Sequence, residues 1–150
     1  MSSTPIEIRP LAPSDRAGWE PLFEAYLGFY ESELPKQQYD LTWTRFHDDA
    51  EPMHALGAFD EGKLVGIVHV VFHRSTWLAD TTCYLQDLYV DESQRGRGVG
   101  EQLIEKVALL AREKNAGRLY WLTQENNATA RRLYDRVAVA PGFIQYRKAL

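Results

Sequence analysis

The residues that could do chemistry are densest between Gln94 and Gly100, where three glycines alternate with arginines and a valine. Glycine has no Cβ, so the backbone can turn sharply there or approach another molecule closely. The apolar run before this stretch predicts a strand, and the run after it predicts a helix whose first N–H groups and dipole would face outward. With the charges of Arg95 and Arg97, the pattern predicts a phosphate or pyrophosphate site, and a plain strand-to-helix turn is the alternative.

Two familiar nucleotide-binding loops do not fit this spacing. A Walker loop requires a lysine and then a serine or threonine directly after its last glycine, whereas Gly100 is followed by Glu101 and Gln102. A Rossmann fingerprint requires a third glycine three residues after Gly98, where Glu101 would instead oppose the pyrophosphate. We therefore expect neither a Walker site nor a Rossmann site.

A second set of candidate residues falls on one stripe of the last predicted helix. Asn127, Ala130 and Tyr134 lie three and seven positions apart, so they face the same side over two turns. Asn127 can hydrogen-bond an amide of a ligand, Ala130 leaves space for it, and Tyr134 carries a proton at the far end. The alternative for Tyr134 alone is a core aromatic residue, but together with the glycine loop the stripe favours a functional role.

A candidate site for a cation lies between the first two predicted helices. Tyr30 stands there near two carboxylates, Glu31 and Glu33, and an aromatic ring with carboxylates can hold an amine. Ordinary surface charge at a helix end is the alternative. The charge distribution gives mild support to the amine, because residues 1–61 carry four Lys or Arg against twelve Asp or Glu, whereas residues 62–150 carry thirteen against nine.

His69 and His73 share one face of a predicted strand, but they do not predict a metal site. Four positions along a strand separate two side chains too widely for comfortable chelation of one ion, and no carboxylate or thiol spacing completes a ligand set. We therefore expect no metal.

Length and composition predict one domain over residues 1–150, because 45% hydrophobic and 12% aromatic residues are enough for a core. The single cysteine, Cys83, cannot form an internal disulfide, and no apolar stretch approaches the ~20 residues of a membrane span. We expect a cytoplasmic protein with neither a membrane nor a nucleic acid as partner.

Hydrophobic periodicity predicts strands that alternate with helices, a fold of the α/β (α+β) class. Strands are expected at about 6–11, 54–59, 63–73, 84–90, 118–123 and 143–147. Helices are expected from about 15 to 34, 37 to 47, 100 to 114 and 125 to 137. The order strand, glycine loop, helix, strand implies a right-handed parallel crossover with a ligand at the carboxyl ends of the strands.

Taken together, these motifs resemble the GNAT superfamily of N-acetyltransferases, which use acetyl-CoA. The resemblance rests on Arg95-x-x-Gly98-x-Gly100, on the preceding strand that ends Leu88-Tyr89-Val90, and on Asn127-x-x-Ala130-x-x-Leu133-Tyr134 at the family's spacing. It covers the chain from about residue 6 to the end. It implies a single-domain fold with a central mixed, mostly antiparallel sheet of six to seven strands and about four helices, and possibly a homodimer.

The resemblance also implies a role for each matched residue. Backbone N–H groups of the glycine loop would hold the pyrophosphate of acetyl-CoA, and the end of the preceding strand would bind pantetheine and the acetyl carbonyl. Asn127 would contact the cofactor arm, and Tyr134 would face the thioester sulfur. The implied cofactor-binding residues are Leu88, Tyr89, Val90, Arg95, Gly96, Arg97, Gly98, Val99, Gly100, Asn127, Ala130 and Tyr134.

Two stretches depart from the family's pattern. The residues 138–141 lengthen the connection before Gly142-Phe143, which bears on the shape of the acceptor mouth. Gln86 precedes Asp87 where small-amine relatives often carry a glutamate, so a carboxylate often proposed as the base is absent.

The expected reaction is direct attack of a primary amine on the thioester. An amine with a pKa near 10.4 is neutral in only about one molecule in two thousand at pH 7, so deprotonation needs help, for which Glu33 and Asp87 are the candidate bases. A β-bulge near Leu88–Val90 would free an N–H for the developing oxyanion. Tyr134 is expected to donate to the departing thiolate, as an acid or as a hydrogen-bond donor.

The acceptor amine is left open among a small molecule, a polyamine, an amino acid and a protein lysine, with Tyr30, Glu31, Glu33 and Gln86 as candidate acceptor-binding residues. A non-catalytic module that senses acetyl-CoA or a nucleotide is the alternative function. Tyr134 favours the enzyme, because a sensor needs no proton donor at the sulfur, and Gln86 slightly favours the sensor.

Overall fold

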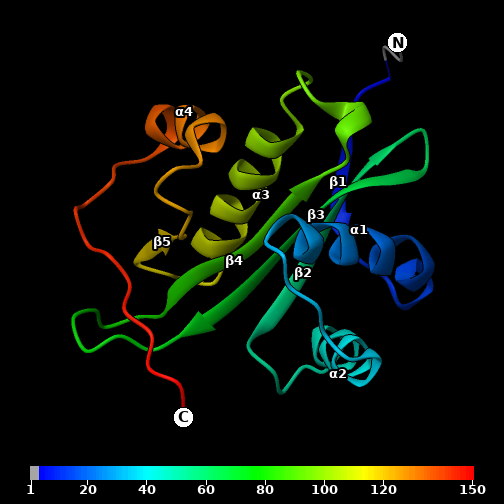
Figure 1. Ribbon diagram of the computed structural model, residues 1–150. Helices are drawn as coiled ribbons and strands as arrows, with labels where there is room; N and C mark the ends of the chain where they lie inside the picture. The colour runs from blue at the N-terminus through cyan, green and yellow to red at the C-terminus, as the bar shows by residue number, and fades with distance from the viewer. Residues whose placement is uncertain (1–3) are drawn as a thin grey trace.

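A five-stranded sheet forms the centre of the protein (Figure 1). The computed structural model describes residues 4–150. Its strands are β1 (Glu7–Pro10), β2 (Met53–Asp60), β3 (Lys63–His73), β4 (Thr82–Val90) and β5 (Arg118–Tyr120), and they lie in that order. Neighbours pair antiparallel from β1 to β4, and β4 pairs parallel with β5. The sheet is mixed and mostly antiparallel as predicted, but it has five strands, not six or seven.

Helices cover both faces of this sheet (Figure 1). On one face lie α1 (Arg16–Phe29) and α2 (Lys36–Phe46), and on the other lie α3 (Val99–Glu113) and α4 (Ala128–Val137). Short 3₁₀ turns precede α1 (Pro13–Asp15) and α3 (Glu92–Gln94). The predicted set of four helices is confirmed, and within residues 4–150 none of them combines the length and apolarity that crossing a membrane requires.

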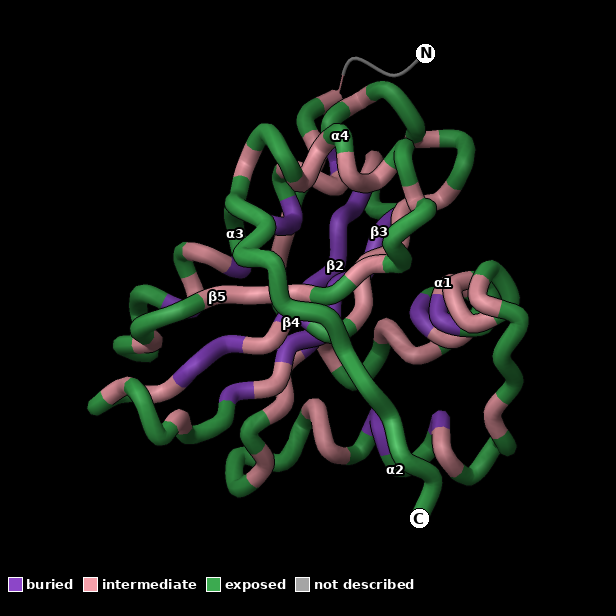
Figure 2. Tube along the Cα trace, turned by 60° about the vertical axis from the view of Figure 1, so that its left-hand side comes forward, coloured by how far each residue is buried: buried purple, intermediate pink, exposed green. Residues whose placement is uncertain are grey.

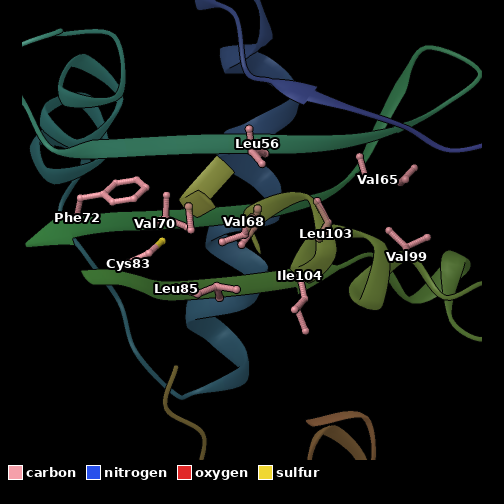
Figure 3. Packing of buried hydrophobic residues seen from close by; sticks show 13 residues of the cluster. Leu56, Val65, Val68, Val70, Phe72, Cys83, Leu85, Val99, Leu103 and Ile104 are labelled. Atoms are coloured by element: carbon pink, nitrogen blue, oxygen red, sulfur yellow. The ribbon is translucent and has the colours of Figure 1, made fainter. Parts of the chain in front are cut away.

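An aliphatic core lies between the sheet and α3 (Figure 3). Val99, Leu103 and Val107 repeat every fourth position of α3, so they form one buried stripe on the helix. They pack against buried side chains of the central strands, namely Leu56, Ala58, Val65, Val68, Val70, Phe72, Cys83 and Leu85. This packing fixes the first turn of α3, and with it the glycine loop, against the end of β4.

The opposite face carries a core made mostly of aromatic rings. Trp19 of α1 is completely buried, and its ring centroid lies 4.7 Å from that of Trp43 in α2 and 5.4 Å from that of Phe23. His69 of β3 points into the same cluster, with 5.9 Å between its ring centroid and that of Trp19. The aromatic spacing of the first two predicted helices therefore marks their buried sides correctly.

The predicted last strand at 143–147 is wrong. Every residue from 138 to 150 is exposed, and Phe143 and Ile144 keep 80% and 75% of their surface in contact with solvent (Figure 2). An alternating apolar pattern favours an extended backbone, but a strand also needs a partner for its N–H and C=O groups. Within residues 4–150 no strand pairs with this segment.

Two elements near this segment are shorter than predicted. β5 ends at Tyr120 instead of Thr123, and α4 begins at Ala128 instead of residue 125. Trp121 follows the end of the strand and packs edge-on against Tyr134, with 5.5 Å between ring centroids. The sequence pattern predicted that β5 would continue, but the strand ends where the ring of Trp121 packs against α4.

Cys83 provides a test of the packing between the sheet and α3. Its side chain is fully buried, and burial raises the pKa of the thiol to about 11. A raised pKa lowers the thiolate fraction, so at pH 8 roughly one thiol in a thousand would be ionised. We expect a thiol reagent to modify the folded protein at least ~100-fold more slowly than the urea-unfolded protein; equal rates would contradict this packing.

Candidate active site

The glycine loop, residues 94–100, connects the 3₁₀ turn after β4 to α3. Gly96 and Gly98 have φ angles of 83° and 74°, a left-handed conformation that L side chains rarely adopt. Arg95 and Arg97 donate their backbone N–H groups to carbonyls of the preceding turn. The loop N–H groups that donate to no backbone carbonyl within residues 4–150 are those of Gly96, Gly98, Val99 and Gly100. These four are the loop's available donors for an anion.

The two arginines of the loop have different surroundings. The guanidinium of Arg97 donates to Asp60 Oδ2 at 2.9 Å and to the carbonyl of Thr4 at 3.1 Å, so it clamps the loop to the end of β2. The side chain of Arg95 is 60% exposed, and its nearest carboxylate, that of Glu92, is 3.9 Å away. Arg95 is therefore free to move toward an anion, whereas the charge of Arg97 is already compensated.

The outer edge of β4 is open beside the loop. β5 pairs with β4 only from Thr82 to Tyr84, so among the described residues 4–150 the stretch from Leu85 to Val90 is paired on its β3 side alone. Leu88, Tyr89 and Val90, which the resemblance assigns to the cofactor, lie on this unpaired stretch. Alternate residues there direct backbone N–H and C=O groups outward, where they can hydrogen-bond an amide-bearing ligand.

A β-bulge lies in β4, at Gln86 and not at the predicted position near Leu88–Val90. His69 pairs with Asp87, and the next residue of β3, Val70, pairs with Leu85, so Gln86 is the extra residue. A bulge changes the direction of neighbouring side chains. Here Asp87 Oδ2 lies 2.8 Å from Nδ1 of His69, whose Nε2 accepts a hydrogen bond of 2.8 Å from the indole N–H of Trp19.

Three tyrosines are within electrostatic reach of Asp87. Burial, followed by the negative charge of Asp87, raises the pKa of Tyr26, of Tyr30 and of Tyr84. Burial also raises the pKa of Tyr134, with a smaller contribution from Tyr30. Tyr30, the residue that caps the end of α1, is thus within electrostatic reach of both Asp87, one predicted base, and Tyr134, the predicted proton donor.

The other predicted acceptor-binding residues have exposed side chains. Glu31 and Glu33 are exposed between α1 and α2, and the charge of Glu33 acts on Tyr39. Gln86 is also exposed, while its backbone carbonyl accepts a hydrogen bond of 3.4 Å from the hydroxyl of Tyr26. The structure therefore groups Tyr30 with Asp87, and it leaves the two glutamates at the surface.

The stripe on α4 has the expected geometry. Asn127 is the N-cap, and its side-chain oxygen accepts from the N–H of Ala130 at 3.3 Å, so the amide NH₂ remains for a ligand. Leu133 of the same helix approaches Gly100, because a Cβ added at Gly100 would lie 3.7 Å from Leu133 and 4.0 Å from Val90. The position of Gly100 therefore faces the space between the open edge of β4 and α4.

Sequence reasoning missed Tyr26, Tyr84, His69 and Trp121 as neighbours of this site. His69 and Asp87 are separated by 18 positions and meet only because the bulge sets the register of two strands. Tyr26 comes from α1 and Tyr84 from β4. These contacts join residues that are far apart in the sequence, so no local spacing predicts them. The sequence does show an aromatic stripe on α1, to which Tyr26 belongs.

A hollow of about 610 Å³ lies elsewhere, between β1 and α3. It shares Gly98 with the glycine loop, but Glu101 and Glu105 also line it. Carboxylates disfavour a polyphosphate, so we do not assign this hollow to the anion.

Comparison with known proteins identifies the family to which this arrangement of loop, open strand and helix belongs. The model of the acetyltransferase (GNAT) family matches residues 19–138, which include β4, the glycine loop and α4. The chain belongs to the GNAT acetyltransferase family. The predicted resemblance and the predicted enzyme class, an acyltransferase, are therefore confirmed.

Individual relatives agree with this assignment. The chain is 32% identical over 150 residues to the D-amino-acid N-acetyltransferase HPA3 of Saccharomyces cerevisiae, covering 99% of this chain and 93% of that protein. It is 35% identical over 85 residues to the thialysine N-epsilon-acetyltransferase of Bos taurus, covering 57% of this chain and about half, 49%, of that protein. Its fold matches the structure of AAC(6')-Iy in complex with a CoA-S-monomethyl-acetylneamine bisubstrate analog, with a TM-score of 0.83, 18% identity, and coverage of 98% of this chain and 100% of that one.

Substitution of Gly100 tests the space between β4 and α4. An alanine Cβ would make only ordinary contacts there, at 3.7 Å and 4.0 Å, so the fold should accept Gly100→Ala. We expect the melting temperature to stay within about 3 °C and acetyl-CoA affinity by calorimetry to fall ~10-fold, because the added methyl group narrows the space for the ligand.

The control is Gly28→Ala, another helical glycine, whose added Cβ would meet nothing within 4 Å. This variant should keep both stability and affinity. Unchanged acetyl-CoA affinity in Gly100→Ala would show that the ligand does not occupy the space between β4 and α4.

Proposed function

We propose that the protein transfers an acetyl group from acetyl-CoA to a primary amine of a small molecule. The observation that carries the proposal is the open edge of β4, which links the free N–H groups of the glycine loop at one end to Asp87 and the tyrosine cluster at the other. A long ligand with an anionic end, amide groups along its arm and a reactive thioester matches that order of chemistry.

The residues available in the structure fit acetyl-CoA. The N–H groups of the loop, with mobile Arg95, would hold the pyrophosphate, and the side-chain amide of Asn127 would meet the pantetheine arm. Bound acetyl-CoA would supply an activated thioester, so the protein has to align an amine with it and stabilise charge. The unpaired backbone groups at Leu88–Val90 are suitably placed to orient the acetyl carbonyl.

Tyr134 would hold a proton for the sulfur side of the reaction. Its pKa is raised by burial, so the hydroxyl stays protonated and can donate throughout the neutral range. The ring packs against Trp121, which fixes its direction. A fixed, protonated phenol suits donation to a departing thiolate.

Asp87 would receive the amine on the other side. Its negative charge attracts an ammonium group and favours its approach past the hydroxyls of Tyr26, Tyr30 and Tyr84. The names of two relatives, which act on D-amino acids and on thialysine, support a free amino acid or a similar small amine as acceptor. The sensor alternative loses its argument from Gln86, because Asp87 supplies a carboxylate at the adjacent position.

Tyr134→Phe tests the proposed proton donor. The substitution keeps the ring, so acetyl-CoA affinity and melting temperature should barely change, while kcat measured by release of free CoA should fall by about 10- to 10⁴-fold. Because the pKa of Tyr134 is raised, its ionisation should cause no loss of activity below about pH 10. Wild-type kcat in the variant would remove Tyr134 from the mechanism, and a wild type inactive with every amine of a broad panel would favour the sensor.

Asp87→Asn and Glu33→Gln form a matched pair of charge-neutral isosteres. Because Asp87 lies among the tyrosines and Glu33 is exposed, we expect kcat/KM for the amine to fall ~100-fold in the first variant and less than ~2-fold in the second. Acetyl-CoA affinity should be unchanged in both. Equal losses of kcat/KM would show that Asp87 has no special role.

A further inference from the structure

We propose that His69 and Trp19 are positioning residues for the reaction, which hold Asp87 in one orientation through a buried chain of hydrogen bonds. The proposal rests on the function assigned above to Asp87. The indole N–H of Trp19 donates to Nε2 of His69 at 2.8 Å, and Nδ1 of His69 lies 2.8 Å from Oδ2 of Asp87. Trp19 is 0% exposed and His69 3% exposed, whereas the Asp87 side chain retains 16% of its exposure.

The first hydrogen bond favours one tautomer of His69. An indole nitrogen can only donate, so Nε2 of His69 must present a lone pair to it. The proton that His69 donates to Asp87 is then on Nδ1. A proton on Nε2 would place two N–H groups head to head, so the contact with Trp19 favours this one tautomer.

The surroundings of His69 hold its ring in one place. The ring of Phe23 in α1 lies 4.8 Å from that of His69, and so does the ring of Phe46 in α2, measured between centroids. Asp87 of β4 is the only acidic side chain that contacts His69 among the described residues. The titratable hydroxyls nearby are those of Tyr39, against Trp19, and of Tyr26, Tyr30 and Tyr84, around Asp87.

The hydrogen-bond chain from Trp19 through His69 fixes the orientation of Asp87. Oδ2 accepts the proton-bearing nitrogen of His69, so the carboxylate cannot rotate freely and presents one fixed orientation to the ammonium group of the acceptor. The bulge at Gln86 is required for this contact, because it brings Asp87 opposite His69 in the register.

The tautomer of His69 can be measured without any assay of activity. In ¹⁵N-labelled wild-type protein at pH 7, NMR correlations of the imidazole should show a proton on Nδ1 and none on Nε2. Trp19→Phe removes the donor but keeps an aromatic ring, so Nε2 should become free to bind a proton. The NMR pattern of a single tautomer should then be lost. In this variant kcat/KM should decrease as the pH is lowered through about 6–7, because an ordinary imidazole becomes protonated in that range and its charge would neutralise that of Asp87.

Trp43→Phe is the matched control for that variant. Trp43 belongs to the same buried cluster, 4.7 Å from Trp19 between ring centroids, but within residues 4–150 only Trp19 donates an indole N–H to His69. The control should keep the wild-type tautomer and pH profile, even if its melting temperature falls as far as that of Trp19→Phe. An identical pH profile in both variants would overturn the proposal, as would a wild-type His69 that carries its proton on Nε2.

Two substitutions of His69 complete the test. Glutamine can accept from Trp19 through its oxygen and donate to Asp87 through its nitrogen, whereas leucine can do neither. We expect kcat for the amine to fall ~100-fold in His69→Leu and to recover to within ~10-fold of wild type in His69→Gln, with acetyl-CoA affinity unchanged in both. Wild-type kcat in His69→Leu would refute the positioning role. Absence of turnover in the wild type would refute the proposed function instead. The tautomer of His69 measured by NMR would still decide whether the hydrogen-bond chain Trp19–His69–Asp87 exists.

Discussion

The separation of β4 from β5 is the constraint on which the candidate site depends. The two strands pair over three residues, after which β4 continues to Val90 with one edge unpaired. An unpaired buried N–H or C=O costs on the order of 1–3 kcal/mol, so such an edge persists only where water or a ligand can satisfy it. The glycine loop follows directly at the end of this edge, because α3 is held there by its aliphatic stripe. The interrupted pairing of β4 with β5 thereby leaves a row of hydrogen-bonding groups that leads to the anion-binding loop.

The bulge at Gln86 adds the chemical part of the site. Antiparallel strands alternate their side chains between two faces, and one inserted residue changes which face the following side chains occupy. Asp87 thereby meets His69, and the aromatic core between the sheet and the helices α1 and α2 reaches a half-buried carboxylate through two hydrogen bonds. A buried polar chain is costly unless every member is satisfied, and here the donors and acceptors of Trp19 and His69 all have partners.

The sequence predicted the local features well and the non-local ones poorly. The glycine loop before α3 and the helix that carries Ala130 and Tyr134 each lie within one short segment, so spacing alone predicted these two local elements, while their part in a site stays a prediction. The contact between His69 and Asp87 depends on strand register, which no local pattern specifies. The error at 143–147 has the same origin, because the alternating pattern there is that of a strand but the described chain offers no partner. A homodimer and a cytoplasmic location stay predictions.

The charge asymmetry of the sequence also has a structural counterpart. The acidic part, residues 1–61, supplies α1 and α2 on one face of the sheet, and the basic part supplies α3 and α4 on the other (Figure 1). The sheet separates these two layers of helices, but Tyr30, directly after α1, and Tyr134 of α4 lie within electrostatic reach of one another. In the proposed reaction a cationic amine and an anionic acetyl donor are attracted to different layers. The proposal therefore requires the amine and the acetyl donor to meet beside the edge of β4, where the two layers of helices come together.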